Sequence, residues 1–321
     1  MKIVIPGGSG QVGALLARAF HAEGHEVVVL GRTPQQNVPW RVVAWDAKTL
    51  GDWAQEVDGA DAVINLAGRS VNCRYTPANR RAIIDSRVES TRAVGEAIAR
   101  AARPPRVWLQ AGTATIYAHR FDAPNDDITG VLGGAEPGLP DTWRFSLDVA
   151  RQWEEALDGA ETPDTRKVIL RTAMVMSADR RGVFDVLLGL ARRGLGGQSG
   201  DGRQYLSWIH GSDFVRAARW LLDHDSLAGP VVVAAPGSLP NAAFMRDLRE
   251  AAGIKIGLPA TDWMLEIGAR VLGTETELVL KSRRVVPALL PQSGFTFDFP
   301  TWPEAARDLC RRRREGQETT P

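Results

Sequence analysis

Short apolar runs alternate with longer amphipathic stretches along the first two thirds of the chain. The runs that predict strands are residues 2–5, 26–30, 42–45, 62–66, 107–110, 168–170 and 231–234. Helical spacing of apolar positions covers residues 14–23, 77–103 and 143–157. Strands that alternate with helices form parallel β–α–β units, so the pattern predicts an α/β fold with a doubly wound parallel sheet.

The rhythm changes after Arg171. Residues 182–193 predict a helix, residues 194–202 form a glycine-dense loop, and residues 295–299 alternate like a short edge strand. We therefore expect a sheet domain over 1–174, completed by 206–235, and a smaller, mainly helical substrate lobe built from 175–205 and 236–321. A cleft between two lobes is the default place for a small-molecule substrate.

Composition excludes several classes of protein. The 321 residues are 44% hydrophobic and 24% charged, as in ordinary globular proteins. The 39 basic and 38 acidic residues give a net charge of +1, which leaves no basic excess for nucleic acid. No segment has the apolar length of a membrane span, and Pro6 interrupts the first apolar run too early for a signal peptide.

The chain contains few metal-binding or disulfide-forming residues. Cys73 and Cys310 lie far apart, so we expect no disulfide, a reducing compartment and a cytoplasmic protein. The five histidines form no His-x-x-x-His or Cys/His cluster, so we expect no metal site. The pattern does not indicate an oligomeric state.

The strongest motif is the glycine-rich turn after the first strand. Gly7, Gly10 and Gly13 form a G-x-x-G-x-x-G pattern between a strand and a helix. Glycines let the backbone turn tightly and approach phosphates, and the helix N-terminus offers unpaired N–H groups. This context predicts a dinucleotide-binding site. The alternative is a tight strand–helix turn without a ligand.

The residue after the second strand indicates which dinucleotide is bound. Arg32 follows Gly31, and no acidic residue lies between Leu30 and Trp45. A carboxylate at this point repels a 2′-phosphate, whereas a guanidinium pairs with it, so the sequence favours NADP(H) over NAD(H). The alternative is that Arg32 is a solvated loop residue, because arginine is common in this chain.

Further motifs extend the pattern almost to the end of the chain. They are Asn65-Leu66-Ala67-Gly68, Asp85-Ser86-Arg87, Trp153-Glu154-Glu155-Ala156, Gly194-Leu195-Gly196-Gly197, the stretch GRQYLSWIH at 202–210, and Arg284-Val285-Val286-Pro287. With these motifs the chain resembles the extended and atypical short-chain dehydrogenase/reductases. Within them it is most similar to the sugar-nucleotide-epimerase-like branch that carries a small C-terminal domain of unknown function.

The resemblance implies roles at an NADP(H) site. It assigns Gly7, Ser9, Gly10, Gln11, Val12 and Gly13 to the phosphate loop, Arg32 to the 2′-phosphate, Trp45 and Asp46 to the adenine, Leu66, Ala67 and Gly68 to the adenosine ribose and pyrophosphate, and Met174 and Val175 to the nicotinamide carboxamide. Arg87 stands where this branch carries an arginine and related epimerases carry an asparagine.

One departure concerns catalysis. Related enzymes use a tyrosine as general acid/base, and a lysine four residues later lowers its pKa. The three tyrosines here, Tyr75, Tyr117 and Tyr205, are followed at that spacing by Asn79, Phe121 and Ile209. The expected tyrosine and lysine positions fall near Ser146 and Ala150, which cannot play these parts.

Two candidate catalytic residues remain after the fifth strand. Thr113 matches the place of the family's catalytic hydroxyl, and Tyr117 follows it in the same turn. A hydroxyl at Thr113 can hydrogen-bond a substrate oxygen. The alternatives are that Thr113 caps backbone groups at the strand end and that Tyr117 is a packing residue.

The GRQYLSWIH stretch suggests a substrate wall. Its candidate substrate residues are Arg203, Gln204, Ser207, Trp208 and His210, because an indole beside polar groups suits a flat or sugar-like ligand. The alternative is structural: Trp208 packs in the core, His210 is a satisfied buried imidazole and Asp213 caps a helix.

Together these features predict an NADP(H)-dependent oxidoreductase or epimerase-like enzyme that acts on a small carbonyl or sugar-like substrate. The alternative is a non-catalytic NADP(H)-binding regulatory or scaffold protein, which the missing tyrosine–lysine pair favours.

Overall fold

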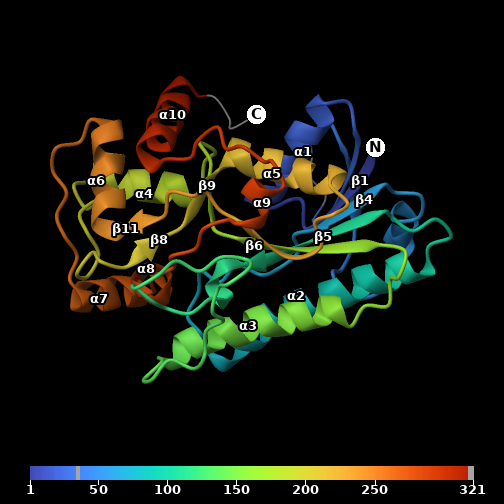
Figure 1. Ribbon diagram of the computed structural model, residues 1–321, viewed down its shortest axis with the longest axis horizontal. Helices are drawn as coiled ribbons and strands as arrows, with labels where there is room; N and C mark the ends of the chain where they lie inside the picture. Colours follow the sequence, from blue (N-terminus) through green and yellow to red (C-terminus); the bar gives the residue numbers. More distant parts are fainter. Residues whose placement is uncertain (34–36, 317–321) are drawn as a thin grey trace.

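Seven of the apolar runs pair into one parallel sheet in the computed structural model, which describes residues 1–33 and 37–316. The strand order is β10-β6-β5-β4-β1-β2-β3 (Figure 1). Helices α2 and α3 cover one face of the sheet, and α1 and α5 cover the other (Figure 1). The predicted α/β fold with a doubly wound parallel sheet is confirmed.

The elements have the following bounds. The strands are β1 Lys2–Pro6, β2 Glu26–Gly31, β3 Arg41–Ala44, β4 Ala62–Asn65, β5 Val107–Thr113, β6 Arg166–Thr172, β7 Met174–Met176, β8 Tyr205–Leu206, β9 Trp208–His210, β10 Gly229–Val233 and β11 Leu239–Pro240. The α-helices are α1 Gln11–Ala22, α2 Pro77–Arg100, α3 Asp141–Asp158, α4 Val183–Arg192, α5 Gly211–Asp223, α6 Asn241–Ala252, α7 Asp262–Leu272, α8 Glu277–Leu280, α9 Leu289–Gln292 and α10 Trp302–Glu315. Two 3₁₀ turns are η1 Asp52–Glu56 and η2 Ala114–Ile116.

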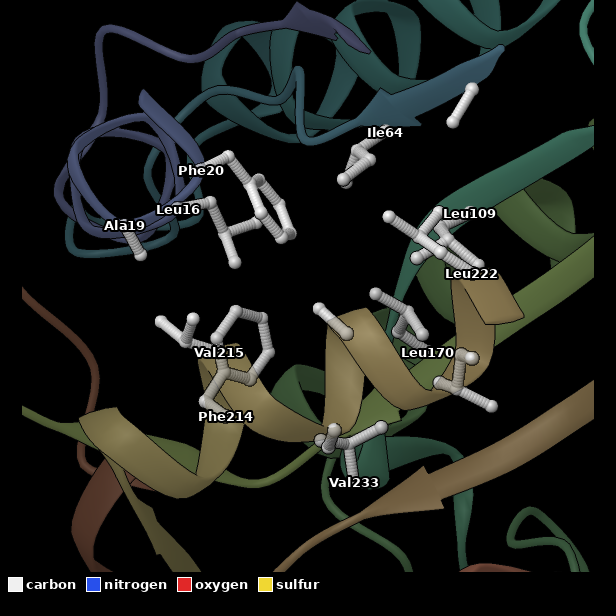
Figure 2. Packing of buried hydrophobic residues seen from close by; sticks show 14 of the residues in the cluster. Leu16, Ala19, Phe20, Ile64, Leu109, Leu170, Phe214, Val215, Leu222 and Val233 are labelled. Carbon is white, nitrogen blue, oxygen red and sulfur yellow. The ribbon is translucent and has the colours of Figure 1, made fainter. Parts of the chain in front are cut away.

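Successive residues of each central strand point to opposite faces, which explains why the strands read as continuous apolar runs. Ile3 and Ile5 pack under α1 and α5, whereas Val4 between them packs on the α2 and α3 side. Figure 2 shows the first of these clusters, in which Phe20 of α1 and Phe214 of α5 face sheet residues such as Ile64. Both faces are buried, so the sheet is the core of the molecule.

The strand order reverses direction between β1 and β4. The chain runs outward from β1 through β2 to β3, then returns to the other side of β1 and continues outward from β4. In open α/β sheets, ligands bind outside the carboxyl ends of the strands at such a switch point. The glycine turn after β1 and the Leu66-Ala67-Gly68 loop after β4 meet there.

A third hydrophobic cluster lies beyond the sheet. It is formed by Met176, Phe184, Leu188, Leu206, Trp208, Phe244, Leu248, Trp302 and Leu309, with smaller neighbours. Short strand pairs, β7 with β9 and β8 with β11, lead into it. Helices α4, α6, α7 and α10 gather at this end of the molecule (Figure 1). The exact domain boundaries stay a prediction.

The expected edge strand at residues 295–299 is wrong, because the segment has no strand pairing. Phe295 is buried in the sheet-side cluster and packs edge-to-face on Phe297. The backbone N–H groups of Asp298 and Phe299 donate to the Asp213 carboxylate, each at 2.9 Å. The alternation therefore reflects aromatic packing against α5, with a buried carboxylate in place of a neighbouring strand.

Within the described residues, no helix is long and apolar enough to cross a membrane, and no group of three or more His, Cys, Asp or Glu side chains is arranged to hold a metal ion. Both cysteines are free thiols.

Asp213→Asn is expected to lower the free energy of unfolding by about 2 kcal/mol, because an amide cannot accept both N–H groups and its own N–H₂ faces one of them. Urea unfolding followed by circular dichroism measures the change. Asp225→Asn is the matched control, since the Asp225 side chain is 68% exposed and its ion pairs lie at the surface. Equal stability of the Asp213 variant and wild type would contradict the anchoring role.

Candidate functional site

The glycine turn is held by backbone contacts that only glycine permits. Gly7 has φ +77°, and a Cβ there would lie 2.6 Å from the backbone nitrogen of Ala67. A Cβ on Gly13 would lie 2.4 Å from the Cα of Gly8. At Gly10 the nearest atom to such a Cβ is the Gly7 carbonyl oxygen, at 3.6 Å. Gly7 and Gly13 are thus packing glycines, and Gly10 leaves space for a ligand.

The open side of the turn suits an anion. Gly10 caps α1 without a side chain, and the first turn of α1 carries no acidic residue. Ser9 and Gly10 are exposed, and Gln11 and Val12 are half-buried. A cavity of about 610 Å³ borders Gln11 and is lined by Arg18, Asp179, Arg180, Arg181 and Arg313 among other described residues. Helix N–H groups favour phosphate oxygens.

Gln11 connects the turn to the segment after β7. Its Nε2 donates to the Ser177 hydroxyl at 2.9 Å, and a Cβ on Gly182 would strike the same amide. Met174 and Val175 lie in β7 just before Ser177, with Val175 buried and Met174 half-buried. The structure therefore brings the predicted phosphate loop close to the strand predicted to border the nicotinamide.

Arg87 lies directly beneath the loop after β4. A Cβ on Gly68 would meet its guanidinium carbon at 3.3 Å, and Nη1 donates to the carbonyl oxygens of Arg69 and Ile83, each at 3.0 Å. The guanidinium also lies 4.8 Å from the centre of the Trp153 ring. Burial lowers the pKa of Arg87 to about 10. Among the described residues, no carboxylate pairs with Arg87, and its guanidinium is held by carbonyl oxygens and an aromatic ring.

The adenine-side residues differ in exposure. Arg32 follows β2 and is exposed. Trp45 is buried and packs edge-to-face on Trp53. The Asp46 carboxylate accepts hydrogen bonds from Thr49 and from the Lys48 backbone N–H, and the Thr49 hydroxyl is the main reason that its pKa is lowered. Both side chains are engaged within their own turn, so their role at an adenine stays a prediction.

Thr113 and Tyr117 have different surroundings. Thr113 ends β5, is half-buried, and its hydroxyl accepts from the Thr115 N–H at 3.1 Å. Tyr117 is buried, and its hydroxyl accepts from Arg171, which forms a bidentate pair with Glu154. Burial raises the pKa of Tyr117. The geometry favours a packing role for Tyr117. The Thr113 hydroxyl caps the backbone of the following turn, and it also lies at the carboxyl end of β5, where a ligand is expected.

Four of the five residues of the predicted substrate wall are buried. Gln204 donates to the carbonyl oxygens of Ser199 and Val279, and Ser207 bonds to the backbone of Arg283 and Val285. The Trp208 indole donates to the Gly237 carbonyl and packs on Trp302. The polar groups at these positions bond to other segments of the chain, so a substrate wall here stays a prediction. Arg203 alone of the five is exposed.

His210 is a buried imidazole, as in the structural alternative. Its Nδ1 accepts from the Ser212 N–H, and its Nε2 lies 3.2 Å from the Asp308 carboxylate on α10. The ring stacks on Phe299 with centroids 4.0 Å apart. His210, rather than Asp213, is therefore the residue that caps α5.

The comparisons with known proteins agree with this geometry. The family model described as the NAD dependent epimerase/dehydratase family matches residues 3–235, and a domain of unknown function, DUF1731, matches residues 260–309. The chain belongs to the NAD dependent epimerase/dehydratase family. The predicted resemblance to the epimerase-like branch with a small C-terminal domain is confirmed.

Relatives of this family cover nearly the whole chain. The Homo sapiens protein named "Epimerase family protein SDR39U1" is 28% identical over 96% of this chain and 99% of its own. A crystal structure of human SDR39U1 (isoform 2) with NADPH has a TM-score of 0.83 at 25% identity, covering 97% of this chain and 99% of that one. A nucleoside-diphosphate sugar epimerase from Corynebacterium glutamicum has a TM-score of 0.74 at 25% identity, covering 100% of this chain and 62% of that one.

Charged side chains of the C-terminal domain lie beside the turn that follows Thr113. Glu277 and Lys281 are each 1% exposed, and Lys281 Nζ lies 3.9 Å from Glu277 Oε1. Arg283 Nη2 lies 3.5 Å from the same oxygen. Ser146, near the expected tyrosine position, donates to Glu277 at 2.5 Å. We term Ser146, Glu277, Lys281 and Arg283 the buried charged cluster.

Sequence reasoning missed the charged members of this cluster. They lie 131 or more residues after Ser146, in a segment whose local pattern is an ordinary short helix. Two features of the sequence could have indicated the cluster. Lys281 is one of only five lysines in an arginine-rich chain, and it follows Glu277 at helical spacing.

Stability should rise with pH above neutrality because of Lys281. Burial, and next the charge of Arg283, lower the pKa of Lys281 to about 8, while Glu277 opposes them. An unfolded lysine titrates near 10.4, so between about pH 8 and 10 the unfolded state binds more protons. The free energy of unfolding of wild type, relative to Lys281→Met, should therefore increase by on the order of 2 kcal/mol from pH 7.5 to pH 10.

Urea unfolding of both proteins across this pH range gives the difference. Taking the difference cancels the contributions of other titrating groups that the two proteins share. A difference that stays constant with pH would contradict the lowered pKa.

Proposed function

We propose that this protein is an NADP(H)-dependent oxidoreductase or epimerase-like enzyme that acts on a small carbonyl or sugar-like substrate. The observation that carries the proposal is the glycine turn. Gly7 and Gly13 are packed against backbone, while Gly10 stays open at the start of α1. A turn built only for packing does not need an open, uncapped helix N-terminus at the switch point of the sheet.

The cofactor is NADP(H) rather than NAD(H). Arg32 is exposed directly after β2, the strand end at which the adenosine ribose binds in such folds. The human relative of known structure was solved with NADPH. Arg87, whose guanidinium has no carboxylate partner among the described residues, offers a second positive charge beneath the loop after β4. When bound, the nicotinamide would supply hydride transfer.

The substrate class follows from the position of Thr113. Its hydroxyl lies at the carboxyl end of β5, and a hydroxyl can both donate to a carbonyl oxygen and accept from an alcohol. A structural relative is described as a nucleoside-diphosphate sugar epimerase, which supports a sugar-like substrate.

A second candidate function is a non-catalytic NADP(H)-binding regulatory or scaffold protein. The observation in its favour is that the chain has no Tyr-x-x-x-Lys, and that Ser146 and Ala150 lie near the expected tyrosine and lysine positions. Ser146 is also hydrogen-bonded to a buried carboxylate.

Fluorescence of bound NADPH distinguishes the two functions. A panel of carbonyl compounds and sugar nucleotides is added to the protein–NADPH complex, and oxidation of the cofactor is followed over time. Oxidation by any compound supports an enzyme. NADPH binding without oxidation by any of them favours the non-catalytic function.

Two glycine variants should separate ligand binding from folding. Gly10→Val is expected to leave the melting temperature close to that of wild type and to weaken NADPH binding about 100-fold or more, because the side chain occupies the phosphate space. Gly13→Val is expected to cost about 2–3 kcal/mol of stability, because its Cβ meets the Gly8 backbone. Calorimetric titration and thermal unfolding measure the two effects. Normal NADPH binding by Gly10→Val would make the turn a structural feature only.

Arg32 should set cofactor preference. A guanidinium–phosphate contact contributes about 1.5–3 kcal/mol, so Arg32→Ala is expected to weaken NADPH binding about 10-fold or more while NADH binding changes little. Titration of both cofactors into both proteins tests this. Equal affinity of wild type for NADPH and NADH would refute the preference.

Thr113 should matter more for turnover than Tyr117. Thr113→Val removes the hydroxyl at the ligand edge and is expected to lower kcat by about 100-fold with a compound found in the panel. Tyr117→Phe should retain most activity, because its hydroxyl is bonded to Arg171 in the interior. His210→Asn serves as the second comparison. Full activity of Thr113→Val would overturn the assignment.

A further inference from the structure

The buried charged cluster calls for a functional explanation. Moving a carboxylate and an ammonium out of water costs several kcal/mol for each ion, and apolar residues often stabilise such a position better. Glu277 and Lys281 are nevertheless both 1% exposed. Titratable groups buried together with specific charge partners are concentrated at functional sites.

One side of the cluster contacts the Thr113 turn. Lys281 Nζ donates to the Thr115 carbonyl oxygen at 3.0 Å, and Arg283 Nε donates to the Thr115 hydroxyl at 3.1 Å. The Thr115 N–H in turn donates to the Thr113 hydroxyl. Thr115 thus links the positive charges of Lys281 and Arg283 to the Thr113 hydroxyl at the carboxyl end of β5.

The other side of the cluster contacts α3. Glu277 Oε2 accepts from the Ser146 hydroxyl, and Glu277 Oε1 faces Lys281. Ser146 is half-buried, unlike Glu277 and Lys281. Polar groups therefore lead from Lys281 through Glu277 to the Ser146 hydroxyl, with 3.9 Å between Lys281 Nζ and Glu277 Oε1 and a hydrogen bond between Ser146 and Glu277.

We propose that Lys281 supplies the lysine function that the missing Tyr-x-x-x-Lys pair leaves vacant, and that it exchanges protons with substrate through Glu277 and Ser146. Lys281 is a positioning and relay residue, and Ser146 is the group that contacts substrate. The inference rests on the proposed function and extends it, because it gives the C-terminal domain a part in the reaction.

The proton balance closes along this path. When a substrate alcohol is oxidised, its C–H hydride leaves to the nicotinamide and its O–H proton passes to Ser146 Oγ. The Ser146 proton moves to Glu277, and Glu277 passes it to the neutral amine of Lys281, which becomes an ammonium. Carbonyl reduction uses the same path in reverse, so no further acid or base is required.

The groups around Lys281 keep both of its forms accessible near neutral pH. Burial and Arg283 lower its pKa to about 8, whereas Glu277 and Glu136 raise it. His119 packs nearby after η2, and its own pKa is lowered first by burial and then by Lys281. A relay group is most useful when its pKa lies near the working pH.

The first test needs no turnover. Lysine labelled with ¹³C at Cε gives five signals in this chain, and the Lys281→Met variant assigns one of them. Saturating NADP⁺ places anionic phosphates in the site, so the pKa of Lys281 is expected to rise by about half a unit or more. Lys167 is the internal control, because its ammonium donates to the carbonyl oxygens of Leu157 and Ala160 at the far end of β6. A Lys281 signal and pKa that NADP⁺ leaves unchanged overturn the proposal.

The second test uses a carbonyl compound from the NADPH panel. Lys281→Met is expected to lower kcat by about 100-fold, to leave the KM for NADPH within about twofold, and to remove the inflection near pH 8 from the kcat profile. Lys281→Arg keeps the charge but exchanges no proton, so it should not restore kcat. Lys167→Met should behave as wild type.

The outcomes separate the two proposals. An unchanged pH profile in Lys281→Met, or full rescue by Lys281→Arg, overturns the relay. Should Lys281→Met fail to fold, Ser146→Ala interrupts the same path at a half-buried position, and an unchanged kcat there has the same meaning. An NADP⁺-dependent shift of Lys281 in a wild type whose bound NADPH is oxidised by no compound of the panel overturns the proposed enzyme function and the relay with it.

Discussion

The close approach of two backbone segments at the switch point of the sheet controls the shape of the whole ligand edge. Gly7 lies so near Ala67 that no side chain fits between them. Asn65 fixes the other segment from below, since its side chain accepts the Ala67 N–H and donates to Gln110 in the interior. With both loops fixed, the open positions at Gly10 and the charge of Arg87 follow from the fold rather than from flexible surface groups.

The sheet could be predicted from sequence because its signal is local. Each central strand is buried on both faces, so residues such as Ile3, Val4 and Ile5 must all be apolar, whatever lies elsewhere in the chain. The phosphate turn could also be predicted from the sequence, because its glycines are required by contacts within one strand–turn–helix unit. Residues 295–299 show the limit of this reasoning. Their alternation is real, but their hydrogen-bond partner is Asp213, 85 residues earlier, and no local pattern reveals it.

The same limit explains the mixed outcome at the site. Ser207 and Trp208 look like a substrate wall in sequence because polar and aromatic groups are interleaved there. A polar side chain that anchors a distant backbone segment has the same signature as one that binds a ligand, and only the partners distinguish them. Ser207 bonds to Arg283 and Val285, so its conspicuous composition reflects attachment of the C-terminal domain. Lys281 shows the converse case, a chemically distinctive residue without a conspicuous motif.

The attachment of the C-terminal domain also makes it part of the site's energetics. Ser207 holds the backbone of Arg283, and the Arg283 side chain holds Thr115, which bonds to Thr113. These are short, partly buried links between a half-buried hydroxyl at the sheet edge and a domain more than 150 residues later in the chain. Buried polar networks strengthen one another when every member is satisfied, and they become costly when one member is lost. The C-terminal domain is therefore connected to the Thr113 turn by a chain of hydrogen bonds. This is a physical reason for the domain to have been retained beside a dinucleotide-binding fold that is already complete in its own seven strands.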